Sequence, residues 1–459
     1  MVSTDFAYSA SPAASEGSVS PWLAGAIVLG TIVFNAVLCF MNTRGLPATP
    51  GIVMASEGLL IGVAALACLR YLNGTHLSVL ALIVLGTVVL SLVRYVDKPS
   101  AGFDPKTTRD LIIPVVFFVL GQAMNNIRAA DKIVIFSTLV LLAFALFEQF
   151  ALNAFLNVFH VAKYYVARGT LSATDIALQY SGGLAINATR AGDQSRSLLP
   201  FLGTHRVSSL FLEPSTLGNF GALVALWAVV RSRMECRFYG LTLICGLILL
   251  VLSDTRLAAL VGALGVVIVL LPPRLTTPAM IAAPFVAVLG LWFFSAWSGP
   301  PGLEPDVQGL GLSERLLYSG QVLDTFNIYD WFGLSLPRSQ TFDAGYAYII
   351  SRASVLGFIA LWLVFMKLQG RTSYFSSFRN AIALYFVAQL CISASPFTIK
   401  LAGMLWFLLG ALSMANAATD KLPSTPIPNR RARETSAAWT VPPQRGVWLQ
   451  LSSPRPSLS

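Results

Sequence analysis

The chain has 459 residues, of which 55% are hydrophobic and only 11% are charged, far below the roughly 25% of charged residues in soluble domains. The formal net charge is +10. In so apolar a chain, this excess indicates membrane topology and anionic lipids or substrates, and excludes a nucleic-acid partner. The five cysteines form no CxxC pair and there are three histidines, which argues against disulfide bonds and metal sites.

Two polar tails enclose the apolar body of the chain. Residues 1–21 contain no Lys or Arg, so they lack the positive region of a cleavable signal peptide and are expected to be disordered. Residues 417–459 are rich in Pro, Ser and Arg and are expected to form a second disordered tail. The functional body is therefore predicted to be one transmembrane unit, residues 22–416.

Apolar stretches close to 20 residues long recur along this body and predict an all-α polytopic bundle of about twelve transmembrane helices. The clearest are 22–41, 51–69, 76–93, 133–151, 209–230, 278–296, 344–366 and 397–416. Shorter ones are 111–126, 238–252, 256–271 and 380–395. The pair around residue 254 forms either a hairpin of two helices or one broken helix.

Basic residues orient the bundle through the positive-inside rule. The short loops around 231–237 and 367–379 are rich in Arg and Lys, which predicts that they and both termini lie in the cytoplasm. One loop departs from the rule, because four of its cations lie on the outer side in this topology: Arg94, Lys98, Lys106 and Arg109.

Two long loops, about 152–207 and 297–343, then face outward. Loops of this length are usually functional or disordered. Apolar residues from Phe155 to Val166 follow the i, i+3, i+4, i+7 spacing, which predicts an amphipathic helix on the outer interface. A similar helix is predicted from Leu312 to Phe326.

The segment Arg206-Val-Ser-Ser-Leu-Phe-Leu-Glu-Pro-Ser-Thr-Leu-Gly218 places charge at the mouth of a membrane helix. Proline favours the first helical position, so a helix is predicted to begin near Pro214 with Glu213 at its N-terminal end. A helix N-terminus with a nearby arginine is an anion site suited to phosphate. Glu213 either caps the helix, or orients substrate or accepts a proton. The other candidates here are Arg196 for phosphate, and Ser208 and Ser215 for substrate.

The second long loop ends with another carboxylate at a helix mouth, Asp343. It can act as a general base toward a sugar hydroxyl or cap the helix. Arg338 and Tyr346 flank it and are candidates for substrate contacts. Arg315 is either a phosphate ligand or a solvated charge beside Glu314.

Ionisable residues also occur within the apolar stretches. Arg256, in Ser-Asp-Thr-Arg, forms either an intrahelical pair or a second anion contact. Four others are expected to face the bundle interior and pair with one another, for example a glutamate with Arg352 or Lys400, because charge is costly in lipid: Glu57, Glu148, Arg352 and Lys400.

Common catalytic motifs are missing from the sequence. It contains no P-loop, GxSxG, DxD or HExxH pattern. Catalysis is therefore expected to use arginines and carboxylates, without a cofactor or metal.

These residues resemble motifs of the bacterial O-antigen polymerase and ligase superfamily, in particular its Wzy-type repeat-unit polymerases. Arg206 to Gly218 is similar to the family's Arg-x-x-Ser-x-Phe-x-x-Pro-x-x-x-Gly segment after a periplasmic loop. Ser253-Asp-Thr-Arg256 resembles its Ser-Arg helix start. The stretch from Arg315 through Asp330-Trp-Phe-Gly-Leu334 to Tyr346 resembles its large second periplasmic loop. The resemblance covers roughly residues 130–416.

This resemblance implies a membrane-embedded, inverting, metal-independent glycosyltransferase of the GT-C type. It would transfer a growing glycan from undecaprenyl diphosphate to a new lipid-linked repeat unit at the periplasmic face of the inner membrane, making exopolysaccharide or O-antigen. Arg206, with Arg315 or Arg256, would bind the diphosphate. Asp343 or Glu213 would activate the acceptor hydroxyl. Membrane lipids, a chain-length regulator and a flippase are the other implied partners.

Two alternatives remain open at this stage. An O-antigen ligase of the same superfamily tends to carry a histidine near the Asp343 position, and none stands there in this chain. A flippase or other transporter tends to concentrate polar groups near the membrane midplane, whereas the main cluster here is predicted at the outer boundary. Both arguments favour a polymerase.

Overall fold

The computed structural model describes residues 18–99, 104–171, 183–184, 188, 198–297, 312–337, 341 and 343–416. All of these residues belong to one compact unit, Met1–Ala417. Most of the two predicted tails, and the candidates Arg196 and Arg338, lie outside the described residues.

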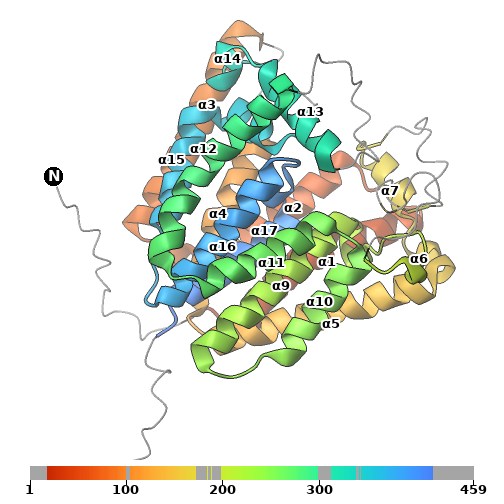
Figure 1. Ribbon diagram of the computed structural model, residues 1–459. Helices are drawn as coiled ribbons and strands as arrows, with labels where there is room; N and C mark the ends of the chain where they lie inside the picture. Colours follow the sequence, from red (N-terminus) through yellow and green to blue (C-terminus); the bar gives the residue numbers. More distant parts are fainter. Residues whose placement is uncertain are drawn as a thin grey trace, which may run out of the picture. The chain divides into compact units, whose positions relative to one another are not determined.

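Every regular element within those ranges is a helix (Figure 1), which confirms the predicted all-α class. Seven helices are long and apolar enough to cross a membrane: α1 Pro21–Thr43, α2 Pro50–Cys68, α3 Gly74–Asp97, α4 Pro105–Met124, α5 Ile127–Phe150, α12 Pro273–Trp297 and α15 Gly345–Lys367. The other long elements are α9 Pro214–Glu235, α10 Gly240–Ser253, α11 Arg256–Leu270, α16 Ser373–Leu390 and α17 Ile399–Ser413. The protein is thus a membrane-embedded helical bundle, and the count of twelve spans stays a prediction.

Burial separates central helices from peripheral ones. All residues of α17 are buried, and it packs closely on α4. In contrast, α3 leaves a row of large apolar side chains exposed, including Leu82, Leu85 and Leu92. An apolar surface of this kind is favourable only next to lipid, so α3 lies at the periphery of the bundle.

Local sequence signals set several helix starts. A proline occupies the first position of α2, α4 and α9, where its missing N–H is not needed. The predicted start of a helix at Pro214 is therefore confirmed. Asp104 caps α4, and its carboxylate accepts hydrogen bonds from the Lys106 backbone N–H at 3.1 Å and the Thr107 hydroxyl at 2.6 Å.

The segment around residue 254 is a helical hairpin rather than one broken helix. Asp254 adopts φ 48°, in the left-handed region, and ends α10. Along α9, Gly221 contacts Gly246 of α10, whereas Ala222 contacts Gly262 of α11. Small residues let membrane helices approach this closely. Both helices therefore pack on α9 (Figure 1), α10 antiparallel to it and α11 parallel to it.

The amphipathic segment of the first long loop differs from its prediction. It forms two short helices, α6 Leu152–Val158 and α7 Val161–Ala167, instead of one. The break lies at His160, whose side chain accepts the Lys163 backbone N–H at 3.3 Å and so caps α7. Phe155 and Tyr165 are buried as the pattern indicated, but they pack against the bundle. In the second loop, α13 Leu312–Asp324 confirms the predicted helix, and a short α14 Ile328–Trp331 follows it.

Candidate functional site

A buried carboxylate fixes the chain in front of α9. Glu148, near the end of α5, accepts hydrogen bonds from the Ser208 backbone N–H at 3.0 Å, the Ser208 hydroxyl at 3.1 Å and the Ser209 backbone N–H at 2.6 Å. Ser209 and Leu212 both have positive φ, 52° and 60°, a conformation that costs free energy in residues other than glycine. Glu148 stabilises this turn, and the Ser208 hydroxyl points into the protein toward it.

Arg206 joins two motifs that lie about 50 residues apart in the sequence. Its Nε donates to the Ser253 carbonyl and its Nη2 to the Thr255 hydroxyl, both at 3.1 Å. The Thr255 hydroxyl in turn donates to the Pro214 carbonyl at 3.2 Å. The guanidinium therefore lies where the α10–α11 turn meets the N-terminus of α9. Arg256 follows as the exposed first residue of α11.

Glu213 is the residue that precedes α9, but its side chain caps no backbone N–H of that helix. One oxygen, Oε1, lies 3.0 Å from Lys400 Nζ and accepts the Tyr165 hydroxyl at 2.9 Å. The other, Oε2, accepts the Thr216 hydroxyl at 2.9 Å. The three groups Lys400, Tyr165 and Thr216 stabilise the ionised form of this carboxylate, and Lys400 also balances its charge. Ser215, half-buried, follows in the first turn of α9.

A second group of charges surrounds the start of α4. Arg109 forms an ion pair with Glu57 of α2 and another with Asp110, 2.6 Å away. Arg352 of α15 lies 3.6 Å from Asp104. These side chains meet around Tyr348: its hydroxyl donates to Asp110 at 2.8 Å, and its ring lies 4.0 Å from the Arg352 guanidinium and 5.7 Å from the Lys106 ammonium.

Helix N-termini carry most of these groups. Lys106, Arg256 and Lys400 are the first or second residues of α4, α11 and α17, Glu213 directly precedes α9, and Asp343 lies two residues before α15. The contacts above place these N-termini at one end of the bundle. Partial positive charge at helix N-termini adds to the arginines and lysines, so this end of the protein is electropositive and suited to a phosphate.

Asp343 lies on a different part of this end. It is exposed, and its backbone carbonyl accepts the Ser319 hydroxyl of α13 at 3.4 Å. The protein that crowds its carboxylate raises its pKa above the ordinary value, and the charge of Arg315 on α13 opposes that shift. Tyr346 is buried two residues into α15, where its hydroxyl donates to the Val387 carbonyl at 3.3 Å.

Sequence reasoning anticipated only part of this arrangement. Lys400 does pair with a glutamate, but with Glu213, which is not one of the four interior residues, and Arg352 pairs with Asp104 instead of a glutamate. Tyr165, Arg168 and Lys106 were not singled out as site residues. The signal for Lys106 was its departure from the positive-inside rule.

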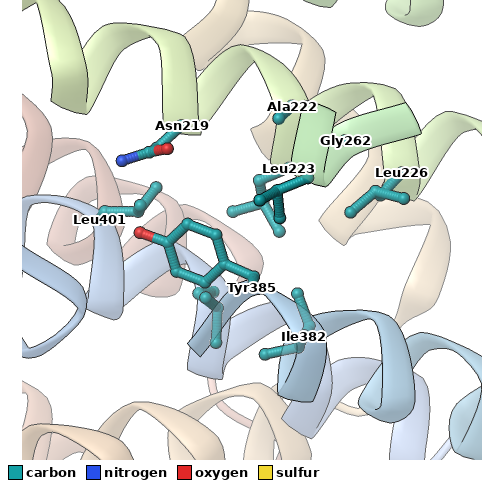
Figure 2. A pocket seen from close by; sticks show the side chains of 10 residues that line it. Asn219, Ala222, Leu223, Leu226, Gly262, Ile382, Tyr385 and Leu401 are labelled. Atoms are coloured by element: carbon teal, nitrogen blue, oxygen red, sulfur yellow. The ribbon is translucent and has the colours of Figure 1, made fainter. Parts of the chain in front are cut away.

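A small cavity lies beside the first half of α9, between this helix and α11, α16 and α17 (Figure 2). Tyr385 extends across it from α16 toward Leu401, and Asn219 of α9 lies nearby. Its volume is about 10 Å³, room for about one water molecule. A sugar does not fit in this space. The described residues contain no group of three His, Cys, Asp or Glu able to hold a metal ion.

Comparisons with family models, curated proteins and solved structures found no match to this chain.

Proposed function

We propose that the protein is a repeat-unit polymerase of the bacterial inner membrane. It would have twelve spans and cytoplasmic termini, and would transfer a growing glycan from undecaprenyl diphosphate to a lipid-linked repeat unit at the periplasmic face. One observation carries this proposal: the Arg206 guanidinium lies at the joint of the α10–α11 turn and the N-terminus of α9. That position offers a fixed cation and two helix N-termini to an anionic leaving group.

In the proposed reaction, the acceptor hydroxyl oxygen forms a bond to the anomeric carbon of the donor glycan. The bond between that carbon and the diphosphate oxygen breaks, and its electron pair leaves with the diphosphate. The hydroxyl proton passes to a carboxylate. Arg206 and Arg256 would stabilise the charge that develops on the diphosphate, since arginine binds phosphate oxygens in pairs.

Of the two candidate bases, Asp343 is favoured over Glu213. A general base works best when its pKa approaches the operating pH. The protein around its carboxylate raises the pKa of Asp343, while part of the residue still reaches the surface. Glu213 is occupied by Lys400, Tyr165 and Thr216, which stabilise its ionised form and weaken it as a base.

The test is a glycan length profile of a deletion strain that carries wild-type protein or a variant. We expect Arg206→Ala to leave single repeat units on the lipid carrier and no ladder of longer glycans, at normal protein level. Arg206→Lys keeps the charge but not the paired hydrogen bonds, so a faint ladder is expected. Arg237→Ala is the control, because Arg237 is exposed beyond the other end of α9 and should leave the ladder unchanged.

Other profiles point to other functions. A normal ladder in Arg206→Ala contradicts the proposed role of this arginine. If the deletion strain makes a full ladder that stays on its carrier, the protein is a ligase. If no repeat unit reaches the outer leaflet in that strain, the protein is a transporter.

A further inference from the structure

We infer that α14, the short helix of the second long loop, is a membrane anchor whose exposed face lies among the lipid headgroups and the outer ends of the acyl chains. Its partner is thus the lipid surface itself. The inference goes beyond the proposed reaction and does not depend on it, because it uses only the side chains of α14 and the position of this helix beside α3.

The exposed face of α14 is apolar and aromatic. Ile328 and Tyr329 each leave 62% of their surface exposed, and Phe332 leaves 38%. The Phe332 backbone N–H donates to the Ile328 carbonyl at 3.2 Å, so these two residues lie one turn apart on the same face. Asp330 is buried, and its carboxylate accepts the Asn327 backbone N–H at 3.0 Å. A contiguous apolar patch of this kind marks a surface that contacts lipid or protein.

The preceding helix of the same loop has no such face. Tyr318, Val322 and Leu323 of α13 are buried, and α13 packs on α12 and α15. The bundle therefore covers the apolar side of α13 but leaves that of α14 open.

Arg94 fixes the depth of α14 along α3. Its guanidinium donates to the carbonyl of Gly333, the residue after Phe332, from Nε at 2.8 Å and from Nη2 at 2.6 Å. Arg94 is buried in the last turn of α3, and Figure 1 shows α14 beside this end of the helix. A helix needs about 20 predominantly apolar residues to cross the hydrocarbon core. In α3, the stretch 77–96 has this length, so Gly333 lies near the boundary between acyl chains and headgroups.

The open face of α14 continues a surface that already faces lipid. Leu92, Tyr95 and Val96, in the last turns of α3, are all exposed, on the helix that lies at the periphery of the bundle. Tyrosines are enriched where acyl chains meet headgroups, since the ring is apolar and the hydroxyl is polar. Tyr95 and Tyr329 both suit this depth. One occupant, the lipid, therefore accounts for the exposed apolar surfaces of both helices.

Anchoring of α14 also fixes the depth of the helix that follows the loop. Besides its link to α3, α14 packs on α15, and Asp343 lies two residues before α15. The anchor would hold the end of the second loop at the level of the headgroups. In the proposed reaction, the diphosphates of lipid-linked substrates lie at this level too.

The test measures the depth of a fluorescent label on the full chain in nanodiscs of phosphatidylcholine and phosphatidylglycerol. Tyr329→Cys is combined with Cys236→Ser and Cys391→Ala, since the other three cysteines are buried, and is labelled with a bimane maleimide. We expect a lipid with a doxyl group near its headgroup to quench this label, and iodide in the water to leave most of its emission. Val96→Cys is the lipid-facing control. Ser313→Cys, exposed near the start of α13, is the control that iodide should quench.

A second variant removes the anchor itself. Ile328→Asn/Phe332→Asn, added to the labelled Tyr329→Cys protein, should reduce quenching by the doxyl lipid and increase quenching by iodide. Both side chains are exposed, so the midpoint of thermal unfolding in detergent should stay unchanged, which separates loss of the anchor from loss of the fold.

Two results overturn the inference. Quenching of the label at position 329 by iodide but not by the doxyl lipid places α14 in water. Protection from both quenchers shows that protein covers this face, and the number of chains in each nanodisc then tells whether a second copy does so. Neither result bears on the glycan ladder of Arg206→Ala, so failure of the anchor is distinct from failure of the proposed function.

Discussion

Lys400 Nζ lies 3.0 Å from Glu213 Oε1, so the start of α17 and the residue before α9 are joined by an ion pair at the electropositive end. Lys400 also donates to the Phe211 carbonyl at 3.3 Å. The lysine is buried and the glutamate only partly so. Loss of one partner therefore leaves a charge in a site with little water, and the two residues should act as a unit.

We expect Lys400→Met alone to lower the free energy of unfolding by about 3 kcal/mol, the scale for breaking a buried ion pair. Lys400→Met/Glu213→Gln should recover a large part of that loss, because no uncompensated charge remains. Thermal unfolding of the detergent-purified variants measures this as a double-mutant cycle. Simple addition of the two single effects would contradict coupling between the residues.

Asp343 should set the acid side of the pH profile of glycan transfer. As a base it must be ionised, so activity should fall as the pH drops through its raised pKa. Arg315→Gln removes a positive charge that favours the ionised form, so the pKa of Asp343 should rise further and the acid limb should move to higher pH. An acid limb that stays in place or moves down in this variant rejects Asp343 as the base. Asp343→Asn should lower the rate about 10²- to 10⁴-fold.

The predicted topology can be measured with alkaline phosphatase fusions, since this enzyme becomes active only outside the cytoplasm. Fusions after Arg168 and after Gly333 should be active, and fusions after Arg237 and after Arg371 should be inactive. The reason is that cytoplasmic loops collect Lys and Arg, and the basic loops at 231–237 and 367–379 lie on the same side in a twelve-span chain. The reverse pattern would place the electropositive end in the cytoplasm and reject a periplasmic reaction.

Local signals in the sequence were sufficient for some features of the fold. The start of α9 follows from Pro214, because the constraint of proline on its own backbone needs no tertiary contact. The apolar spacing also picked out Phe155 and Tyr165, which are buried, but it missed Val161 and Tyr164, which are buried too. It did not predict the break between these helices, since the cap at His160 and the hydrogen bond from the His160 N–H to the Thr43 hydroxyl depend on where α1 lies.

The partners of the buried charges were harder to predict. Hydrophobic periodicity shows which face of a helix is buried, but not which helix covers it. Arg94 illustrates this limit: its guanidinium donates to the Gly333 carbonyl, 239 residues away. The same holds for the meeting of Arg206 with Thr255, which depends on the α10–α11 hairpin that the sequence left open. Candidate residues could thus be named, but their grouping required the tertiary structure.

Gly218 offers a test of that grouping. It faces the α10–α11 turn from α9, and a Cβ atom added there would lie 2.6 Å from both the Ser253 Oγ and the Thr255 Cβ. Such contacts are too short, so Gly218→Ala should push the turn away from α9 and move the two groups that bind Arg206. We expect a loss of about 1–3 kcal/mol in stability, the usual effect of overpacking, and a shortened glycan ladder.

Gly86→Ala is the matched control, because a Cβ atom at Gly86 of α3 meets no atom within 4 Å. Its stability should be unchanged or slightly higher, since alanine favours helix more than glycine does, and its ladder should be normal. Gly218→Ala/Ser253→Ala removes the Ser253 Oγ, one of the atoms in close contact, and keeps the Ser253 carbonyl that accepts Arg206, so it should recover part of the ladder. If Gly218→Ala makes a full ladder, the close contact between α9 and the turn is not required for the position of Arg206.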